Sequence, residues 1–265
     1  MPVPRIALCQ LTSGPDPAAN LDLVREWTAR AAAGDARVVV FPEAMMAAFG
    51  VPLGPLAEPL DGPWASAVAS VAAEHDVLIV AGMFTPAGDR VRNTLLVTGL
   101  GEHRGYDKIH LYDAFGFKES HTVAPGDALA TVTVDGTVLG LATCYDVRFP
   151  SLFQKLAEQG AAAVLLPASW GAGEGKREQW ELLVRARALD SGSWVLACDQ
   201  ADPAVTGVAV NPKAPTGIGY STVADPFGRV HAALGAGADL LITEIDPAVS
   251  TASREATAVL PNRRV

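Results

Sequence analysis

The chain has 265 residues, of which 49% are hydrophobic, and it carries a formal net charge of -9. The hydrophobic content is sufficient for a large buried core, and an acidic chain without a cluster of Lys and Arg is not expected to bind nucleic acid. No apolar stretch is long enough to cross a bilayer and the first residues do not resemble a signal peptide, so we expect a cytoplasmic protein that does not bind membranes. An odd, small set of cysteines argues against a disulfide framework and suits a reducing compartment: Cys9, Cys144 and Cys198.

Apolar and amphipathic segments alternate along the chain. Apolar runs predict strands at 5–11, 36–41, 77–84, 93–98, 129–134, 138–143, 162–166, 194–199, 220–224 and 240–245. Amphipathic segments predict helices at 20–33, 64–75, 152–159 and 177–189. This number of strands is too high for one doubly wound sheet, so we expect an α/β fold of two packed mixed sheets with outer helices, in one domain, 1–265.

Three of the predicted strands lead into chemically distinctive residues. Glu43 follows the second strand directly after a proline, which cannot donate to a sheet ladder and therefore ends the strand. Lys108 follows a short segment, 105–107, and Cys144 follows the strand at 138–143. Each has an ordinary explanation, a solvated charge or an inert buried thiol. Together they form an acid, an ammonium and a thiol at the carboxyl ends of strands, where open α/β sheets bind their ligands.

The segments around these residues resemble the three signature blocks of the nitrilase superfamily of carbon–nitrogen hydrolases. The blocks are Phe-Pro-Glu at 41–43, Tyr-Asp-Lys-Ile-His-Leu at 106–111 and Thr-Cys-Tyr-Asp-Val-Arg-Phe-Pro at 143–150. The third block is similar to that of the branch containing omega-amidases and deaminated glutathione amidases. The resemblance implies a four-layer α-β-β-α sandwich, a homodimer or higher homo-oligomer, and hydrolysis of an amide.

The resemblance also implies a role for each residue at the site. Glu43 would take the thiol proton as Cys144 attacks an amide carbon, and the resulting thioester would be hydrolysed. Lys108 and the backbone N–H of Tyr145 would stabilise the oxyanion. Glu119, in the matching segment 117–120, would orient Lys108 or the attacking water. No cofactor is expected, and the five scattered histidines do not have the spacing of a metal site.

Arg148 lies four residues after the thiol and has two interpretations. It could form an ion pair with Asp146, or its planar guanidinium could bind a substrate carboxylate through two hydrogen bonds. We favour the second interpretation, because substrates of the resembling branch carry a carboxylate distant from the amide that is cut. The sequence thus predicts hydrolysis of a small carboxylate-bearing amide with release of ammonia.

Several alternatives remain open from the sequence alone. The same three residues also serve N-carbamoyl amidohydrolases, and His110 would share a strand face with Lys108 and act as the base of a Cys–His thiol hydrolase. The chain could also be a binding module on a hydrolase scaffold. Two long loops rich in Pro and Gly, 47–63 and 201–219, are predicted to be pocket walls or subunit contacts.

Overall fold

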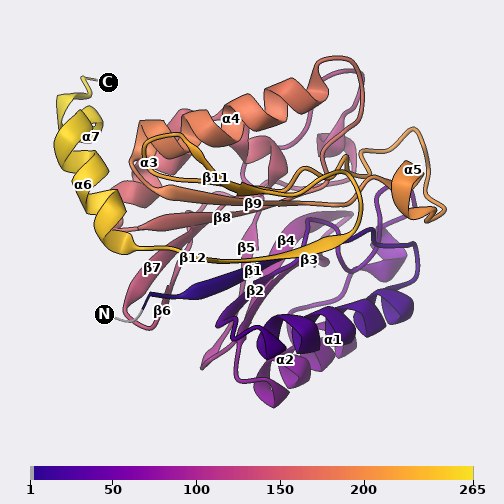
Figure 1. The fold of residues 1–265 in the computed structure, drawn as a ribbon. Helices are drawn as coiled ribbons and strands as arrows, with labels where there is room; N and C mark the ends of the chain where they lie inside the picture. Colours follow the sequence, from indigo (N-terminus) through magenta and orange to yellow (C-terminus); the bar gives the residue numbers. More distant parts are fainter. Residues whose placement is uncertain (1–2, 265) are drawn as a thin grey trace.

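Twelve strands form two six-stranded sheets in the computed structural model, which describes residues 3–264 (Figure 1). Sheet A contains β1 (Arg5–Gln10), β2 (Val38–Val40), β3 (Leu78–Ala87), β4 (Arg90–Gly99), β5 (Glu102–Asp107) and β12 (Asp239–Glu244). Sheet B contains β6 (Thr131–Val134), β7 (Thr137–Leu141), β8 (Ala163–Ala168), β9 (Trp194–Asp199), β10 (Thr222–Ala224) and β11 (Val230–Ala233).

Each sheet is mixed and has three parallel strands next to one another. In sheet A the order is β12-β1-β2-β3-β4-β5, and β1, β2 and β3 are parallel. In sheet B the order is β11-β10-β9-β8-β7-β6, and β7, β8 and β9 are parallel. Two successive antiparallel pairings, β3 with β4 and β4 with β5, turn β5 back to the direction of β2. The carboxyl ends of β2 and β5 therefore lie at the same edge of sheet A.

Helices cover the outer face of each sheet. Helices α1 (Pro17–Ala33) and α2 (Pro63–Glu74) pack on sheet A, while α3 (Pro150–Glu158) and α4 (Lys176–Ser191) pack on sheet B (Figure 1). Shorter helices lie nearer the end of the chain: α5 (Pro203–Thr206), α6 (Pro247–Thr257) and α7 (Val259–Asn262). The predicted four-layer sandwich is confirmed. Within residues 3–264, none of the helices has the length and hydrophobicity needed to cross a bilayer.

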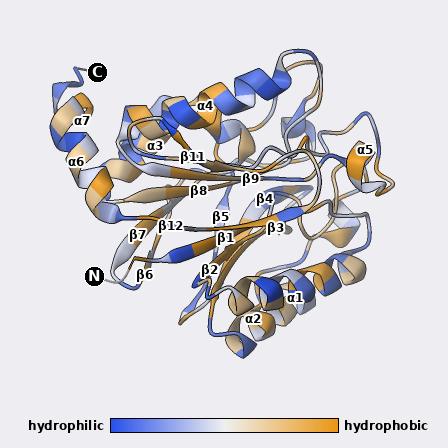
Figure 2. Cartoon of the chain, in the orientation of Figure 1, coloured by the Kyte–Doolittle hydropathy of each residue, from blue (hydrophilic) through white to orange (hydrophobic). Residues whose placement is uncertain are grey.

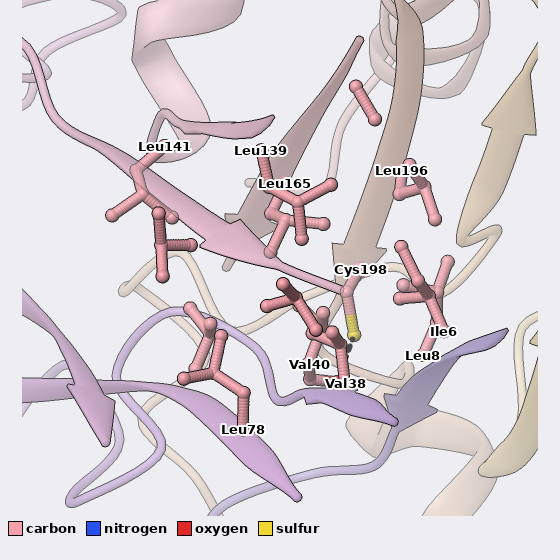
Figure 3. Close-up of a cluster of buried hydrophobic side chains, with 14 of the residues drawn as sticks. Ile6, Leu8, Val38, Val40, Leu78, Leu139, Leu141, Leu165, Leu196 and Cys198 are labelled. Carbon is pink, nitrogen blue, oxygen red and sulfur yellow. Dashed lines mark hydrogen bonds between the residues drawn. The ribbon is translucent and has the colours of Figure 1, made fainter. Parts of the chain in front are cut away.

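The hydrophobic core consists of three layers. The central layer lies between the two sheets, where Leu8 and Val40 of sheet A face Leu165, Leu196 and Cys198 of sheet B (Figure 3). The two other layers lie between each sheet and its helices. Figure 2 shows the consequence for the sequence: the central strands are mostly hydrophobic, whereas α1 and α4 alternate hydrophobic and hydrophilic residues along their length. Strands that are buried on both faces contact no solvent, so their side chains are hydrophobic on both faces.

Some element boundaries differ from those predicted. Helix α1 begins at Pro17 rather than at 20, because the Asp16 side chain accepts a hydrogen bond from the N–H of Ala18 and proline is tolerated in the first turn. Strand β11 and helices α5, α6 and α7 were not predicted. The side chains of β11 are largely exposed, so its residues do not show the apolar run that identifies the other strands.

Candidate active site

Glu43 lies at the carboxyl end of β2 and is fully buried. Its Oε1 atom accepts hydrogen bonds from Lys108 Nζ at 2.9 Å and Asn93 Nδ2 at 2.7 Å. Its Oε2 atom accepts one from the backbone N–H of Ser169 at 2.8 Å. Three donors therefore hold the carboxylate in one orientation.

The backbone at Glu43 passes unusually close to strand β3. A Cβ atom on Gly82 would overlap the backbone N of Ala44 and would lie 2.8 Å from the carbonyl carbon of Glu43. Ala44 itself has a φ of 58°, in the left-handed region. Backbone atoms cannot rotate aside as a flexible side chain can, so glycine at position 82 allows Glu43 to reach the site.

We expect Gly82→Ala to reduce kcat by about 10²-fold, because a shift of roughly 1 Å in a catalytic group has an effect of that size. The matched control is Gly235→Ala, since a Cβ at Gly235 has no heavy atom within 4 Å and its φ is not in the left-handed region. Steady-state kinetics on both folded variants provides the test. A Gly82→Ala variant with the kcat of Gly235→Ala would show that the close approach does not position Glu43.

Lys108 follows β5 and lies between two carboxylates. Its Nζ atom donates to Glu43 Oε1 at 2.9 Å and to Glu119 Oε2 at 2.9 Å, and the side chain is 2% exposed. Burial by itself lowers the pKa of Lys108, but the Glu119 and Glu43 carboxylates outweigh burial and hold this pKa well above its ordinary value. Lys108 is therefore an ammonium, and it also lies 3.2 Å from the second Glu119 oxygen, Oε1, so that both carboxylates hold it.

Glu119 belongs to the same buried network. Its Oε1 accepts a hydrogen bond from Asn93 Nδ2 at 3.1 Å, and its Oε2 accepts one from the backbone N–H of Tyr112 at 2.6 Å. Asn93 thus bridges Glu43 and Glu119 through one amide nitrogen. Glu119 therefore contacts Lys108, which is the contact that Glu119 needs if it orients Lys108.

Cys144 begins a 3-10 helix, η3 (Cys144–Arg148), which is separated from the end of β7 by two residues. Its φ of 45° is in the left-handed region, which is unfavourable for a residue with a side chain. Two hydrogen bonds hold this turn: the Asp146 carboxylate accepts one from the N–H of Thr143 at 2.8 Å, and the backbone carbonyl of Thr143 accepts one from the N–H of Asp146 at 2.9 Å. The buried Asp146 carboxylate also accepts a hydrogen bond from Tyr106 at 2.7 Å.

The Cys144 thiol is close to Glu43 and is protonated at rest. Its Sγ lies 3.9 Å from the carbonyl oxygen of Ser169, the residue whose N–H donates to Glu43. Burial and then the Glu43 carboxylate raise the pKa of Cys144 well above its ordinary value, and Lys108 only partly opposes them. A neutral thiol next to a carboxylate requires a base to take its proton at the moment of attack.

His110 does not lie at this thiol. Strand β5 ends at Asp107, so the expectation that His110 shares a strand face with Lys108 was wrong. The His110 ring nitrogen Nδ1 lies 2.7 Å from Asp146 Oδ1, and the ring stacks on Phe149 at 3.6 Å. His110 is also absent from the residues that line the cavity around Cys144. The Cys–His alternative therefore lacks the contact on which it depends.

A cavity of about 660 Å³ opens onto the thiol. All six predicted site residues line it: Glu43, Lys108, Glu119, Cys144, Tyr145 and Arg148. The loops 47–63 and 201–219 form part of its wall through residues such as Phe49, Leu53, Ala214 and Pro215. Both loops therefore line the cavity, which is one of the two roles predicted for them.

Among residues 3–264, no acidic side chain forms an ion pair with Arg148. Its Nη2 atom donates to Gln179 Oε1 at 2.7 Å, and its Nε atom has no hydrogen-bond partner. The guanidinium lies over the Trp170 ring at 5.1 Å. The alternative in which Arg148 pairs with Asp146 was wrong, because both Asp146 oxygens are occupied by Tyr106, His110 and Thr143.

The sequence analysis did not predict three of the residues that contribute to the site. Asn93 is inside β4 and looks like an ordinary polar residue of a strand, and Lys176 looks like a solvated residue of a helix start. Ser169 follows β8, and its position at a strand end was a signal that the sequence offered. Within residues 3–264, no group of three or more His, Cys, Asp or Glu side chains is arranged to hold a metal ion.

Comparison with known proteins agrees with this geometry. The carbon-nitrogen hydrolase family model matches residues 5–255. The chain is 53% identical to hydrolase Rv0480c of Mycobacterium tuberculosis, over 98% of this chain and 95% of that protein. It is 31% identical to the omega-amidase NIT2 of Mus musculus, over 98% of this chain and 95% of that protein.

The fold is shared as well. The crystal structure of Saccharomyces cerevisiae Nit3, a member of branch 10 of the nitrilase superfamily, superposes with a TM-score of 0.85 and 27% identity. The match covers 99% of this chain and 97% of the yeast chain. From the family match, the arrangement of the two sheets and the residues gathered around Cys144, we conclude that this chain belongs to the carbon-nitrogen hydrolase family and is an enzyme of that family.

Proposed function

We propose that this enzyme is a thiol-dependent amidase that hydrolyses a small carboxylate-bearing amide through a thioester. The observation that carries the proposal is the shared cavity in which a neutral Cys144 thiol, the Glu43 carboxylate and the Lys108 ammonium meet. Similarity to omega-amidase NIT2 supports amide hydrolysis, and the cavity wall that carries Arg148 supports the carboxylate.

In the first half of the proposed reaction, Glu43 takes the thiol proton while the sulfur of Cys144 bonds to the amide carbon. The carbonyl electrons move to oxygen, which the Lys108 ammonium and the backbone N–H of Tyr145 stabilise. When the tetrahedral intermediate collapses, the C–N bond breaks and Glu43 returns its proton to the nitrogen. Ammonia leaves, and the acyl group stays on sulfur as a thioester.

In the second half, Glu43 takes a proton from a water molecule that attacks the thioester carbon. The same two donors hold the oxyanion. Collapse breaks the C–S bond, and Glu43 returns the proton to Cys144. One amide and one water thus give one carboxylic acid and one ammonia. Glu119 keeps Lys108 in place through its 2.9 Å contact.

The direct test is ammonia release from a panel of amides and N-carbamoyl compounds. We expect turnover of amides that carry a carboxylate, and no turnover by Cys144→Ala. Release of ammonia from N-carbamoyl compounds alone would replace this proposal with the carbamoyl alternative, which uses the same three residues. Release from neither class by a folded wild-type protein would favour the binding-module interpretation.

Arg148→Lys keeps a positive charge but loses the planar pair of donors. We expect kcat/KM for a carboxylate-bearing amide to fall about tenfold, and kcat/KM for its uncharged methyl ester to change little, because charge-assisted contacts contribute about 1.5–3 kcal/mol. The measurement is the ratio of the two specificity constants in wild type and variant. Equal losses on both substrates would assign Arg148 a structural role.

We also propose that the protein is a homo-oligomer, at least a dimer, in the cytoplasm. Exposed Leu182 and Leu189 on α4 support an interface, and three free buried cysteines suit a reducing compartment. Light scattering is expected to report at least twice the 27.5 kDa of one chain. A single-chain mass at all workable concentrations would contradict the oligomer.

A further inference from the structure

Lys176, the first residue of α4, is a buried lysine that forms no ion pair with any residue described by the structure. The residue is 8% exposed and lines the same cavity as Cys144. Its Nζ atom donates to the Tyr112 hydroxyl at 3.2 Å. In the part of the chain that the structure describes, no carboxylate oxygen lies within 4.0 Å of this nitrogen. An ammonium has three N–H groups, so the protein leaves most of its bonding capacity unused.

The neighbour of Lys176 is a second cation. Two aromatic rings lie next to both cations. The centroid of the Phe115 ring is 3.4 Å from Lys176 Nζ and 5.7 Å from Arg148 Cζ. The centroid of the Trp170 ring is 5.8 Å from Lys176 Nζ and 5.1 Å from Arg148 Cζ. Burial and then the positive charge of Arg148 lower the pKa of Lys176 below its ordinary value. The free enzyme therefore keeps two repelling cations side by side, which costs free energy unless an anion joins them.

Other buried cations of this protein are treated differently. Lys108 contacts two carboxylates, and the buried Arg187 contacts Asp190 at 3.1 Å. At Lys176 and Arg148 the protein supplies aromatic faces and a neutral amide, Gln179, instead of an acid. Aromatic faces attract a cation but do not neutralise its charge. The missing negative charge points to a ligand.

The charges of the cavity also distinguish its ends. Glu43 lies beside the thiol, Glu119 contacts the neighbouring Lys108, and both carboxylates disfavour a second carboxylate there, whereas Arg148 and Lys176 attract one. These charges therefore favour the orientation of a substrate in which its carboxylate lies at Arg148 and Lys176 and its amide lies at Cys144. Orientation of this kind raises the fraction of productive complexes.

We propose that Lys176 is a specificity-determining residue that, with Arg148, brackets the carboxylate of the amide substrate. The Arg148 guanidinium supplies planar donors and the Lys176 ammonium a compact point charge on the other side of the same anion. This inference rests on the proposed amidase function and adds a residue to it. The exposed ring of Phe115, 3.4 Å from Lys176 Nζ, covers the ammonium on its outer side.

The test measures binding separately from turnover. Succinamate, glutaramate and their uncharged methyl esters are titrated calorimetrically into Cys144→Ala, alone and combined with Lys176→Met, Lys176→Arg or Lys213→Met. Lys213 is the matched control, because it is an exposed lysine at the rim of the cavity and its loss removes the same charge. Lys176→Met is expected to raise Kd for the carboxylates about tenfold or more and to leave the esters within about twofold.

Lys176→Arg is expected to restore most of the affinity, and Lys213→Met to leave all values unchanged. With Cys144 present, Lys176→Met is expected to raise KM for the carboxylates more than it lowers kcat. If Lys176→Met has a lowered unfolding temperature, Lys176→Gln replaces it in the binding test, because the glutamine side chain can still donate to Tyr112. Equal weakening of acid and ester, an equal effect of Lys213→Met, or no binding of either carboxylate would overturn the proposal.

The two proposals fail in different ways. If wild type turns over carboxylate-bearing amides and Lys176 variants show no charge-selective loss, the inference on Lys176 is wrong and the amidase proposal stands. If wild type turns over no amide but still binds glutaramate in a Lys176-dependent manner, the amidase proposal is wrong and the anion site stands.

Discussion

Replacement of Cys144 by Ala is expected to lower amide hydrolysis by at least about 10⁴-fold, because loss of a nucleophile in a covalent mechanism leaves only the residual effect of binding and charge stabilisation. Folding is expected to persist. The change removes one sulfur atom next to an open cavity and keeps the Cβ, so neither a closed core void nor a new backbone strain is created. The measurement is ammonia release, with thermal unfolding as the check on the fold.

Cys198→Ala is the matched control for this variant. Cys198 is also a buried free thiol, with its Sγ 3.3 Å from the carbonyl oxygen of Val40, but it lies in the core between the sheets (Figure 3). This variant is expected to keep kcat and to lose some stability. Turnover by Cys144→Ala within tenfold of wild type would remove Cys144 from the mechanism.

Glu43→Gln is expected to reduce kcat by roughly 10²–10⁴-fold, the usual contribution of a general base. The carboxamide has nearly the same shape but cannot take the thiol proton. It also cannot reproduce the hydrogen bonds of Glu43, because both carboxylate oxygens accept hydrogen bonds. In glutamine, one of these oxygens is replaced by an NH₂ group, which is itself a donor and would face another donor. We therefore expect the variant to lose about 1–3 kcal/mol of stability as well.

The same variant is expected to make the thiol more reactive towards iodoacetamide. Burial and then the Glu43 carboxylate raise the pKa of Cys144, and Lys108 lowers it, so removal of the carboxylate shifts the balance towards thiolate. Alkylation of Cys144 at neutral pH, mapped by mass spectrometry, is thus expected to be faster in Glu43→Gln than in wild type, while hydrolysis is slower. A variant that hydrolyses amide at the wild-type rate would assign the base to another group.

The sequence determined the elements of the sandwich and the positions of its chemically distinctive residues. Apolar runs, two-residue alternation and helical periodicity are local properties, and Pro42 ends β2 before Glu43 through its own missing N–H. The same signals placed Lys108 and Cys144 after strands. The pairing of the strands then decided where these ends lie, because two antiparallel pairings bring the ends of β2 and β5 to one edge of sheet A, while Cys144 comes from sheet B.

The tertiary structure alone decided which ordinary residues complete the site. Asn93, 50 residues from Glu43 in the chain, reaches it because β4 lies two strands from β2 in the sheet. The close approach of Gly82, the pairing of His110 with Asp146 and the burial of Lys176 likewise depend on contacts between distant segments. A side chain's own type and its neighbours in sequence do not carry that information, since its burial and its partners are set by how the sheets, helices and loops pack.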